Sequence, residues 1–283
     1  MPFDLNSWLS IAKEINADNY SYSNEILYSA TNGISILPPA KNATEAQLDK
    51  LASVMLLIGR TYAASPERRK GAKSINDGMI TFFAALAQKM IQSENYAEWR
   101  KTVVELSEAH YAFDGCEEDY RLLQSAHHCV FMLDTIIREF IKTIDEKESL
   151  DDVDHCLSFC SKLLHFIVPQ IFFIKDGISW ESIWSIYRRR ADATIAYKHT
   201  SLKIPKYVFG EYLNKTYPLF TVTKKEKADT NEQQYWFHYR GCYALSCTLK
   251  DVRLISQTKN FNGIADIHSL PRLVDTILLH IKA

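Results

Sequence analysis

Apolar residues recur every three or four positions along most of this 283-residue chain, with polar residues between them. That spacing is typical of amphipathic helices, which turn one apolar face toward a core. It predicts helices over residues 45–58, 75–90, 99–106, 117–144 and 149–164, and further helices that begin near residues 177, 205 and 270. We therefore expect a mainly α fold.

Polar residues mark the starts of several of these helices. Thr44, with Gln47 three positions later, forms a capping-box pattern before the first of them. Ser74 and Ser149 stand where the N-caps of two later helices belong. The helix that opens at Ser149 is expected to run without a break through residues 152–160.

A proline and a short apolar connector follow that helix. Pro169 lacks a backbone N–H group and disfavours helix in the residue before it. Residues 171–174 are then four apolar positions in a row, which predicts a buried connector. Asp176 follows at the N-cap position of the next helix.

The C-terminal third gives weaker signals. Residues 221–233 are polar and charged, and we expect them to form a loop. Residues 235–255 are rich in aromatic side chains and fit either a helix or a strand. A closing helix is expected over residues 270–281.

Length and composition are those of a globular protein. A chain of this size forms one domain over residues 1–283, or two helical lobes at about 1–148 and 149–283 around a central cleft. No apolar run reaches the roughly 20 residues that span a bilayer, and the first residues lack a signal-peptide pattern. The six cysteines are irregularly spaced, which favours reduced thiols and a cytoplasmic location.

Charge is distributed unevenly although the net charge is only −1. Residues 94–154 carry 16 acidic and 6 basic side chains, whereas residues 187–227 carry 10 basic and 3 acidic ones. A second basic cluster lies within residues 60–73. Opposed faces of this kind steer a polyanion toward one side of a protein, although a solvated face without a ligand fits the same pattern.

Lys162 and Asp176 are the residues whose side-chain chemistry most clearly suggests a catalytic site. A deprotonated lysine amine attacks electrophilic carbon, and a nearby carboxylate stabilises or activates that centre. A solvated lysine and a simple helix cap would leave the same residues in the sequence, so residue types alone keep both interpretations open.

The run from Ser161 to Asp176, SKLLHFIVPQIFFIKD, resembles the helix-hairpin-helix superfamily of DNA glycosylases, in particular its oxoguanine-glycosylase-like branch. In that family a helix carries a Thr/Ser-Lys pair, a connector with proline follows, and a catalytic aspartate caps the next helix. Ser161-Lys162, Pro169 and Asp176 match these positions in order. The upstream LLIGRTYAASPERR is similar to a segment of bacterial relatives from phage-defence loci. Together the two stretches cover about a tenth of the chain.

The resemblance implies that the protein excises a modified base from DNA, leaves an abasic site and needs no cofactor. The candidate base is a glucosylated hydroxymethylcytosine of phage DNA, with oxidised guanine as the alternative. Asp176 would stabilise the positive charge on the sugar. Lys162 would attack C1′ and form a Schiff base, which gives lyase activity, or would contact a phosphate.

A glycosylase must also flip its target base and hold the DNA backbone. The candidates for contact with the base are Tyr62, His165, Trp180 and Trp184. The candidates for contact with the backbone are Arg68, Arg69, Ser161, Arg188, Arg189 and Arg190. Each ring fits a core position as well as a base clamp.

Two departures from the family weaken the match. The Gly-rich hairpin that precedes the family's lysine is absent, because residues 152–160 are predicted to be continuous helix. The interval from Lys162 to Asp176 is also shorter than is usual in the family. In the family that hairpin binds a DNA phosphate. Because it is absent here, the sequence does not indicate how DNA would bind, and Asp176 is a stronger catalytic candidate than Lys162.

The sequence leaves three other interpretations to consider. Arg121 and His127 fit the loose Arg-x(4–6)-His pattern of helical HEPN ribonucleases. The chain could also be a helical nucleic-acid-binding module without enzymatic activity. Cys156, Cys160 and His165 lie close in sequence, but no second ligand pair with zinc-site spacing accompanies them, so no metal is expected.

Overall fold

A computed structural model describes residues 20–39, 42–62, 64, 66, 78–188, 193–197, 200–204, 208–222, 228–251, 270–278 and 281–282. The chain divides into two compact units. Unit 1 comprises residues 1–21, 110–127 and 169–283, and unit 2 comprises residues 22–109 and 128–168. The expected lobe boundary near residue 148 does not coincide with this division, because each unit combines segments from both halves of the chain.

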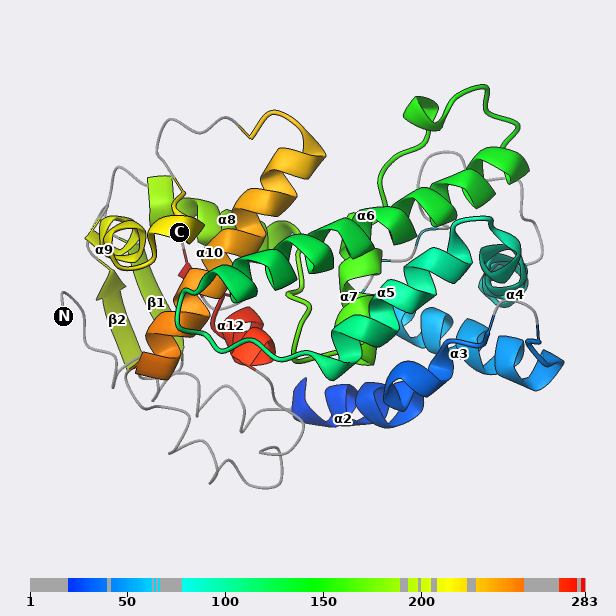
Figure 1. The fold of residues 1–283 in the computed structure, drawn as a ribbon, viewed down its shortest axis with the longest axis horizontal. Coiled ribbons are helices and arrows are strands. Elements are labelled where there is room, and N and C mark those ends of the chain that lie inside the picture. The colour runs from blue at the N-terminus through cyan, green and yellow to red at the C-terminus, as the bar shows by residue number, and fades with distance from the viewer. Residues whose placement is uncertain are drawn as a thin grey trace. The chain divides into compact units, whose positions relative to one another are not determined.

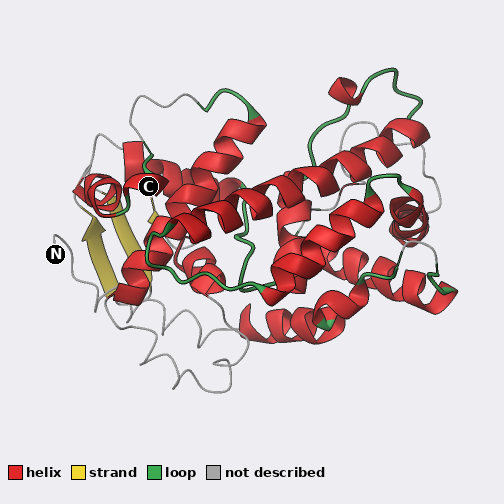
Figure 2. Ribbon diagram, viewed as in Figure 1, coloured by secondary structure: helices red, strands yellow, loops and turns green. Residues whose placement is uncertain are grey.

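The fold is mainly α, as the hydrophobic periodicity predicts (Figure 2). Unit 2 contains most of α2 (Tyr20–Thr31), the 3₁₀ turn η1 (Gly33–Ile36), α3 (Glu45–Thr61), α4 (Gly78–Gln92), α5 (Tyr96–Glu108), the later part of α6 (Glu117–Ile144), η4 (Leu150–Asp152) and α7 (Leu157–Ile167) (Figure 1). Helix α3 packs on both α4 and α7. The capping box of Thr44 and Gln47 is present as predicted. The predicted cap at Ser74 lies outside the described residues.

The core of unit 2 is built from the predicted apolar faces. Phe82, Phe83 and Trp99 are all at most 1% exposed. The indole of Trp99 donates a hydrogen bond to the carbonyl of Cys129, 3.1 Å away. A large buried ring therefore keeps its polar atom satisfied and links α5 to α6.

The expected continuous helix through residues 152–160 is wrong. The chain forms η4, leaves the helix at Val153 and re-enters it after Cys156. Polar side chains of α6 replace the missing helical hydrogen bonds. Asp134 accepts from the Cys156 N–H at 2.5 Å, and Arg138 donates to the carbonyls of Val153 and Leu150. The segment before Lys162 thus contains a turn, although it has no glycine.

Unit 1 combines helices with a small antiparallel sheet. Its elements are the start of α6, α8 (Gly177–Arg188), β1 (Ala193–Tyr197), β2 (Thr200–Ile204), α9 (Val208–Thr216), η5 (Pro218–Phe220), α10 (Asn231–Asp251), α12 (Leu270–Leu278) and β3 (Ile281–Lys282) (Figure 1). The strand order is β2-β1-β3, and Ile195 of β1 pairs with Leu202 on one side and Ile281 on the other. The hydrophobic pattern of the sequence does not predict these strands.

Helix α10 resolves the ambiguous C-terminal region. It is a helix from Asn231 to Asp251, so residues 231–233 were wrongly assigned to a loop. Thr230 begins it, since its hydroxyl accepts from the N–H of Gln233 at 3.2 Å. The predicted closing helix is shorter than expected: α12 ends at Leu278, and Ile281 belongs to β3.

Two glycines let α9 and α10 approach α8 closely. A Cβ atom on Gly241 of α10 would lie 2.8 Å from a methyl group of Ile183, and one on Gly210 of α9 would lie 3.2 Å from the Cα atom of Tyr187. Both distances are shorter than ordinary van der Waals contact, so a side chain at either position would require its neighbour on α8 to shift. Helix α8, which follows Asp176, is thereby held by two neighbours.

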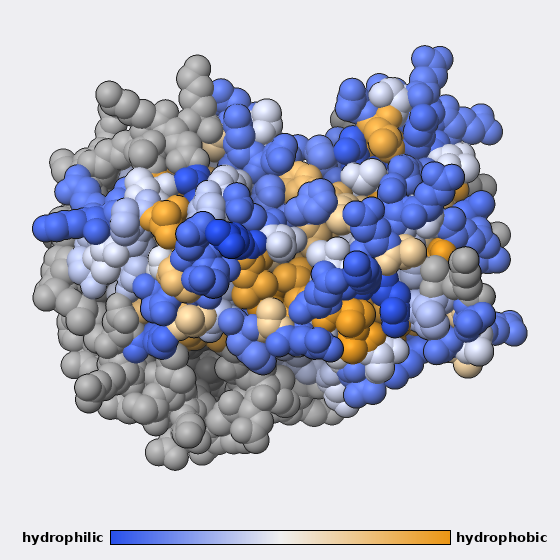
Figure 3. Space-filling model, in the orientation of Figure 1, coloured by the Kyte–Doolittle hydropathy of each residue, from blue (hydrophilic) through white to orange (hydrophobic). Residues whose placement is uncertain are grey.

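Hydrophilic residues (blue) predominate on the face drawn in Figure 3. Large apolar side chains that are more than two-fifths exposed are scattered among the described residues: Ile26, Ile80, Ile178 and Leu219. Of the helices that the structure describes, none is long and apolar enough to cross a membrane.

Candidate functional site

Asp176 caps α8 as the sequence predicts. Its Oδ1 atom accepts a hydrogen bond from the N–H of Ser179 at 2.9 Å, and its own N–H donates to the Ser179 hydroxyl at 3.0 Å. This reciprocal pair fixes the carboxylate at the positive end of the helix dipole. Asp176 is partly exposed, whereas the connector of residues 171–174 before it is at most 2% exposed.

His238 of α10 anchors the end of that connector. Its Nε2 atom lies 2.9 Å from the carbonyl oxygen of Ile174, and because a carbonyl only accepts, Nε2 carries the proton. His238 is fully buried. Burial, together with the positive charge of Lys175, lowers its pKa from 6.5 to about 3. The neutral ring therefore holds the backbone two residues before Asp176.

Lys175 lies between these two anchors. Its Nζ atom is 5.4 Å from the ring centre of Trp180 and 5.6 Å from that of Tyr235. Burial lowers the pKa of this lysine, and the neighbouring Asp176 carboxylate only partly opposes the effect. A larger fraction of its amine is therefore unprotonated at neutral pH than in a solvated lysine.

Aromatic side chains of α8 and α10 surround this cluster. The ring centres of Trp180 and Trp184 lie 5.0 Å apart, and both rings contact Phe237. Both tryptophans remain partly exposed. These two predicted base-binding residues therefore share unit 1 with Asp176.

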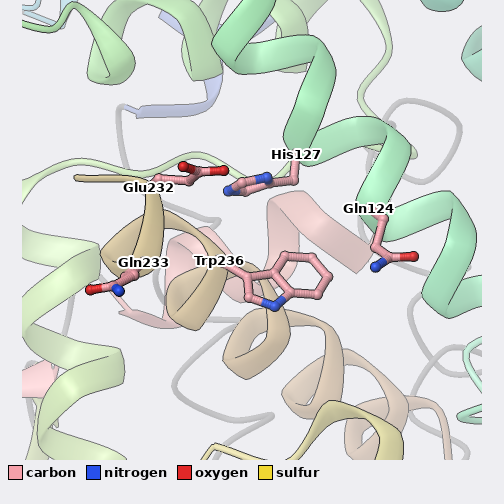
Figure 4. A pocket seen from close by; sticks show the side chains of 5 residues that line it. All are labelled: Gln124, His127, Glu232, Gln233 and Trp236. Atoms are coloured by element: carbon pink, nitrogen blue, oxygen red, sulfur yellow. The ribbon is translucent and has the colours of Figure 1, made fainter. Parts of the chain in front are cut away.

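A pocket of about 310 Å³ lies between α6 and α10 in the same unit. Its lining residues are Gln124, His127, Glu232, Gln233 and Trp236 (Figure 4). In Figure 4 the carboxylate of Glu232 points toward the His127 ring, which also meets Trp236 edge-on at 5.3 Å between centres. The flat indole and the polar amides suit a planar ligand with hydrogen-bonding edges.

Tyr235 joins the pocket to the Asp176 cluster. Its ring centre is 5.7 Å from that of His127 and 5.6 Å from the Lys175 amine. Tyr235 is fully buried. One aromatic residue of α10 thus contacts both the wall of the pocket and the amine beside Asp176.

The remaining predicted site residues with described side chains lie in unit 2. Lys162 is 2% exposed, and its amine donates to the Ser158 hydroxyl at 3.2 Å and lies 5.2 Å from the centre of the Tyr62 ring. His165 is fully buried and shares a 2.7 Å hydrogen bond with Tyr28.

Ser161, a predicted phosphate contact, is also fully buried. Its hydroxyl donates to the Ser158 carbonyl within the same helix. Most of the predicted DNA-backbone contacts are arginines whose side chains the structure does not describe. Arg68, Arg69, Arg189 and Arg190 lie outside the described residues, and Arg188 ends α8 with its side chain likewise not described.

The two residues of the ribonuclease pattern do not face one another. His127 lines the pocket, whereas the exposed side chain of Arg121 pairs with Glu117 at 2.6 Å. Six residues on an α-helix correspond to a rotation of about 240°, which points the two side chains in different directions. The site contains the histidine of this pattern without the arginine beside it.

One group within the described residues has the spacing of metal ligands: Asp114, Cys116 and Asp119. Hydrogen bonds already explain its geometry. The carboxylate of Asp119 accepts from the N–H groups of Ala112 and Phe113, at 2.9 and 2.7 Å, and from the Tyr243 hydroxyl. We interpret the group as the polar anchor of the turn before α6.

The sequence pattern does not mark Lys175, His238 or the pocket as functional. The Lys-Asp dipeptide was visible in the sequence, but the burial of Lys175 depends on α10, about 60 positions later. Comparison with protein-family models, curated proteins and solved structures finds no match for this chain. The resemblance to glycosylases therefore stays a prediction.

Proposed function

We propose that this protein is a DNA N-glycosylase that excises a modified base and uses the Asp176 carboxylate as its central catalytic group. The observation that carries the proposal is the fixed position of Asp176 at the N-terminus of α8. A buried connector leads to it, a lysine with a lowered pKa adjoins it, and partly exposed tryptophans follow it.

These groups fit the chemistry of N-glycosidic bond cleavage. As the bond between C1′ and the base breaks, its electron pair leaves with the base and positive charge builds on the sugar ring. A carboxylate held in place before the reaction stabilises this charge without reorganising. Water then adds to C1′ and gives up a proton to the Asp176 carboxylate, and an abasic site results.

The pocket between α6 and α10 is the proposed site for the flipped base. The Trp236 indole offers a stacking surface, the Gln124 amide offers donors and an acceptor, and the Glu232 carboxylate offers acceptors. Trp180 and Trp184 provide a second aromatic surface beside Asp176.

The proposed substrate is phage DNA that carries a modified cytosine, such as glucosylated hydroxymethylcytosine, and the role is antiviral defence. This choice rests on the sequence resemblance. Oxidised guanine in damaged DNA is the second substrate to test. The ribonuclease alternative has the location of His127 in a pocket in its favour and the exposed pairing of Arg121 against it.

One assay separates these alternatives. The purified protein is incubated with phage DNA carrying modified bases, with unmodified duplex DNA, with duplex containing oxidised guanine and with structured RNA. Abasic sites, strand breaks and RNA fragments are scored for the wild type, for Asp176→Asn and for His127→Ala. Abasic sites that form with the wild type and are lost in Asp176→Asn support the proposal. RNA cuts lost in His127→Ala favour the ribonuclease, and binding without a product favours a non-enzymatic module.

A further inference from the structure

We infer that Lys175, rather than Lys162, is the amine that condenses with the sugar aldehyde at the proposed glycosylase site. The inference rests on the proposed function, because the abasic sugar is the product of that reaction. It goes further by assigning a covalent step to a residue that the sequence resemblance does not mark.

Backbone geometry favours Lys175. The preceding residue, Ile174, is bound through its carbonyl by His238, and the following residue, Asp176, is bound twice by Ser179. Lys175 therefore stands on a backbone segment fixed from both sides. A catalytic amine on such a segment needs little ordering before it reacts.

The surroundings of the amine also suit a nucleophile. Trp180 and Tyr235 flank Nζ at 5.4 and 5.6 Å from their ring centres, and the side chain remains partly exposed. Ring faces attract an ammonium group, but these distances approach the limit of about 6 Å for that effect. Burial lowers the pKa of Lys175, the Asp176 carboxylate opposes this only in part, and the net effect favours the reactive neutral amine.

Lys162 has a different environment. It belongs to unit 2, whereas Asp176 and Lys175 both belong to unit 1. Its side chain is 2% exposed and its amine already donates to Ser158 within α7. These contacts are typical of a lysine that stabilises the packing of α7 against Tyr62.

The proposed step balances without a cofactor. The neutral Lys175 amine adds to the C1′ aldehyde carbon of the ring-opened abasic sugar, and the carbonyl oxygen leaves as water after proton transfer. A C1′=N Schiff base replaces the C1′=O bond. Borohydride added as the reductant delivers a hydride to C1′, and the nitrogen takes a proton, which leaves a stable secondary amine.

The test uses DNA with a preformed abasic site, so base excision is not required. The full-length wild type, Lys175→Gln, Lys175→Arg and Lys162→Gln are mixed with this DNA and borohydride, and the adducted residue is mapped by peptide mass spectrometry. Lys215→Gln is the matched control, because Lys215 is an exposed lysine of α9 in the same unit.

The expected result is an adduct on Lys175 in the wild type. Trapping should fall at least tenfold in both Lys175 variants and stay within twofold of the wild type in Lys162→Gln and Lys215→Gln. Lys175→Arg keeps the positive charge, so loss of trapping with retained DNA binding distinguishes a nucleophile from a simple phosphate contact.

An adduct that maps to Lys162 or to scattered surface lysines, or no adduct at all, would overturn the inference. Mapping the adduct on the wild-type protein identifies the reactive lysine even if a variant fails to fold. The proposed function is scored separately, as release of base from DNA that still carries it. Base release without a Lys175 adduct would contradict only the role of Lys175. A Lys175 adduct without base release would contradict only the proposed glycosylase activity.

Discussion

Asp176 has two roles that a substitution can separate. Its Oδ1 atom caps α8, and its negative charge is the proposed catalytic feature. Asparagine caps helices as well as aspartate does, but carries no charge. The residue therefore allows stability and activity to be measured independently.

We predict that Asp176→Asn leaves the free energy of unfolding within about 0.5 kcal/mol of the wild type, whereas Asp176→Ala lowers it by about 1 kcal/mol. The loss in the alanine variant follows from the unsatisfied N–H of Ser179. Urea titrations monitored by circular dichroism measure the free energy of unfolding of both variants. Equal destabilisation by the two substitutions would show that the cap does not act as described.

His238 gives a prediction about pH. Its pKa is about 3 in the folded protein against an ordinary 6.5, so the folded protein keeps this ring neutral through mildly acidic pH. Between these values the unfolded chain binds a proton that the folded chain cannot. Stability therefore falls as pH drops below 6.5, by about 1.4 kcal/mol for each pH unit.

His238→Gln should remove this dependence while keeping an N–H donor for the Ile174 carbonyl. From pH 7 to pH 5 the wild type should lose about 2 kcal/mol more unfolding free energy than the variant. Urea titrations of both proteins at the two pH values provide the comparison. Parallel losses in the two proteins would mean that His238 is not held neutral.

At the scale of elements, the break before α7 depends on polar contacts from α6. The carboxylate of Asp134 is 1% exposed and binds the His155 ring at 2.6 Å, the Cys156 N–H, and the Arg138 guanidinium at 3.9 Å. Removing it would leave the buried charge of Arg138 without its counter-charge. This kind of loss is strongly destabilising in proteins.

Asp134→Ala is expected to lower the free energy of unfolding by about 3 kcal/mol. Asp154→Ala, an exposed carboxylate on the same segment, is the matched control and should change it by less than about 0.5 kcal/mol. Thermal or urea unfolding gives both values. An Asp134→Ala protein as stable as its control would refute the assigned role of this contact.

The close approach of α8 and α10 makes a second prediction at this scale. Gly241→Ala adds a methyl group 2.8 Å from buried Ile183, whose β-branched side chain has little freedom to move. Alanine gains up to about 1 kcal/mol of helix propensity, yet overpacking costs about 1–3 kcal/mol, so we expect net destabilisation. Gly177→Ala, where the added atom meets nothing within 4 Å, is the control. A Gly241→Ala protein that melts above the wild type would contradict the packing.

Elements with strong local signals were predicted well, and elements set by distant contacts were not. Residues 117–144 carry a long apolar stripe and form α6 over the predicted range. The break after Asp152 was missed, because Asp134 and Arg138 impose it from another helix. The strands β1 and β2 are only five residues each and follow a run of arginines. Segments this short show no clear alternation of apolar and polar residues in the sequence.

At the scale of the molecule, the two units join segments that are far apart in sequence. A boundary near residue 148 was expected from contiguous halves, but residues 110–127 cluster with the C-terminal half and residues 149–168 with the N-terminal half. Periodicity reports which face of a helix is buried and not which helix covers it. For the same reason Asp176 was found from its N-cap position, whereas Lys175 and His238 became visible only with α10 in place.

The groups of the proposed glycosylase site, Asp176, Lys175 and the pocket on α6 and α10, all belong to unit 1. The most direct test is the count of abasic sites in phage DNA with modified bases after incubation with the wild type and with Asp176→Asn. We predict that abasic sites accumulate with the wild type and fall at least 100-fold, by about 2.7 kcal/mol of transition-state stabilisation, with a variant that folds equally well. Equal abasic-site formation by both proteins, or none by the wild type on modified or oxidised DNA, would contradict the proposal.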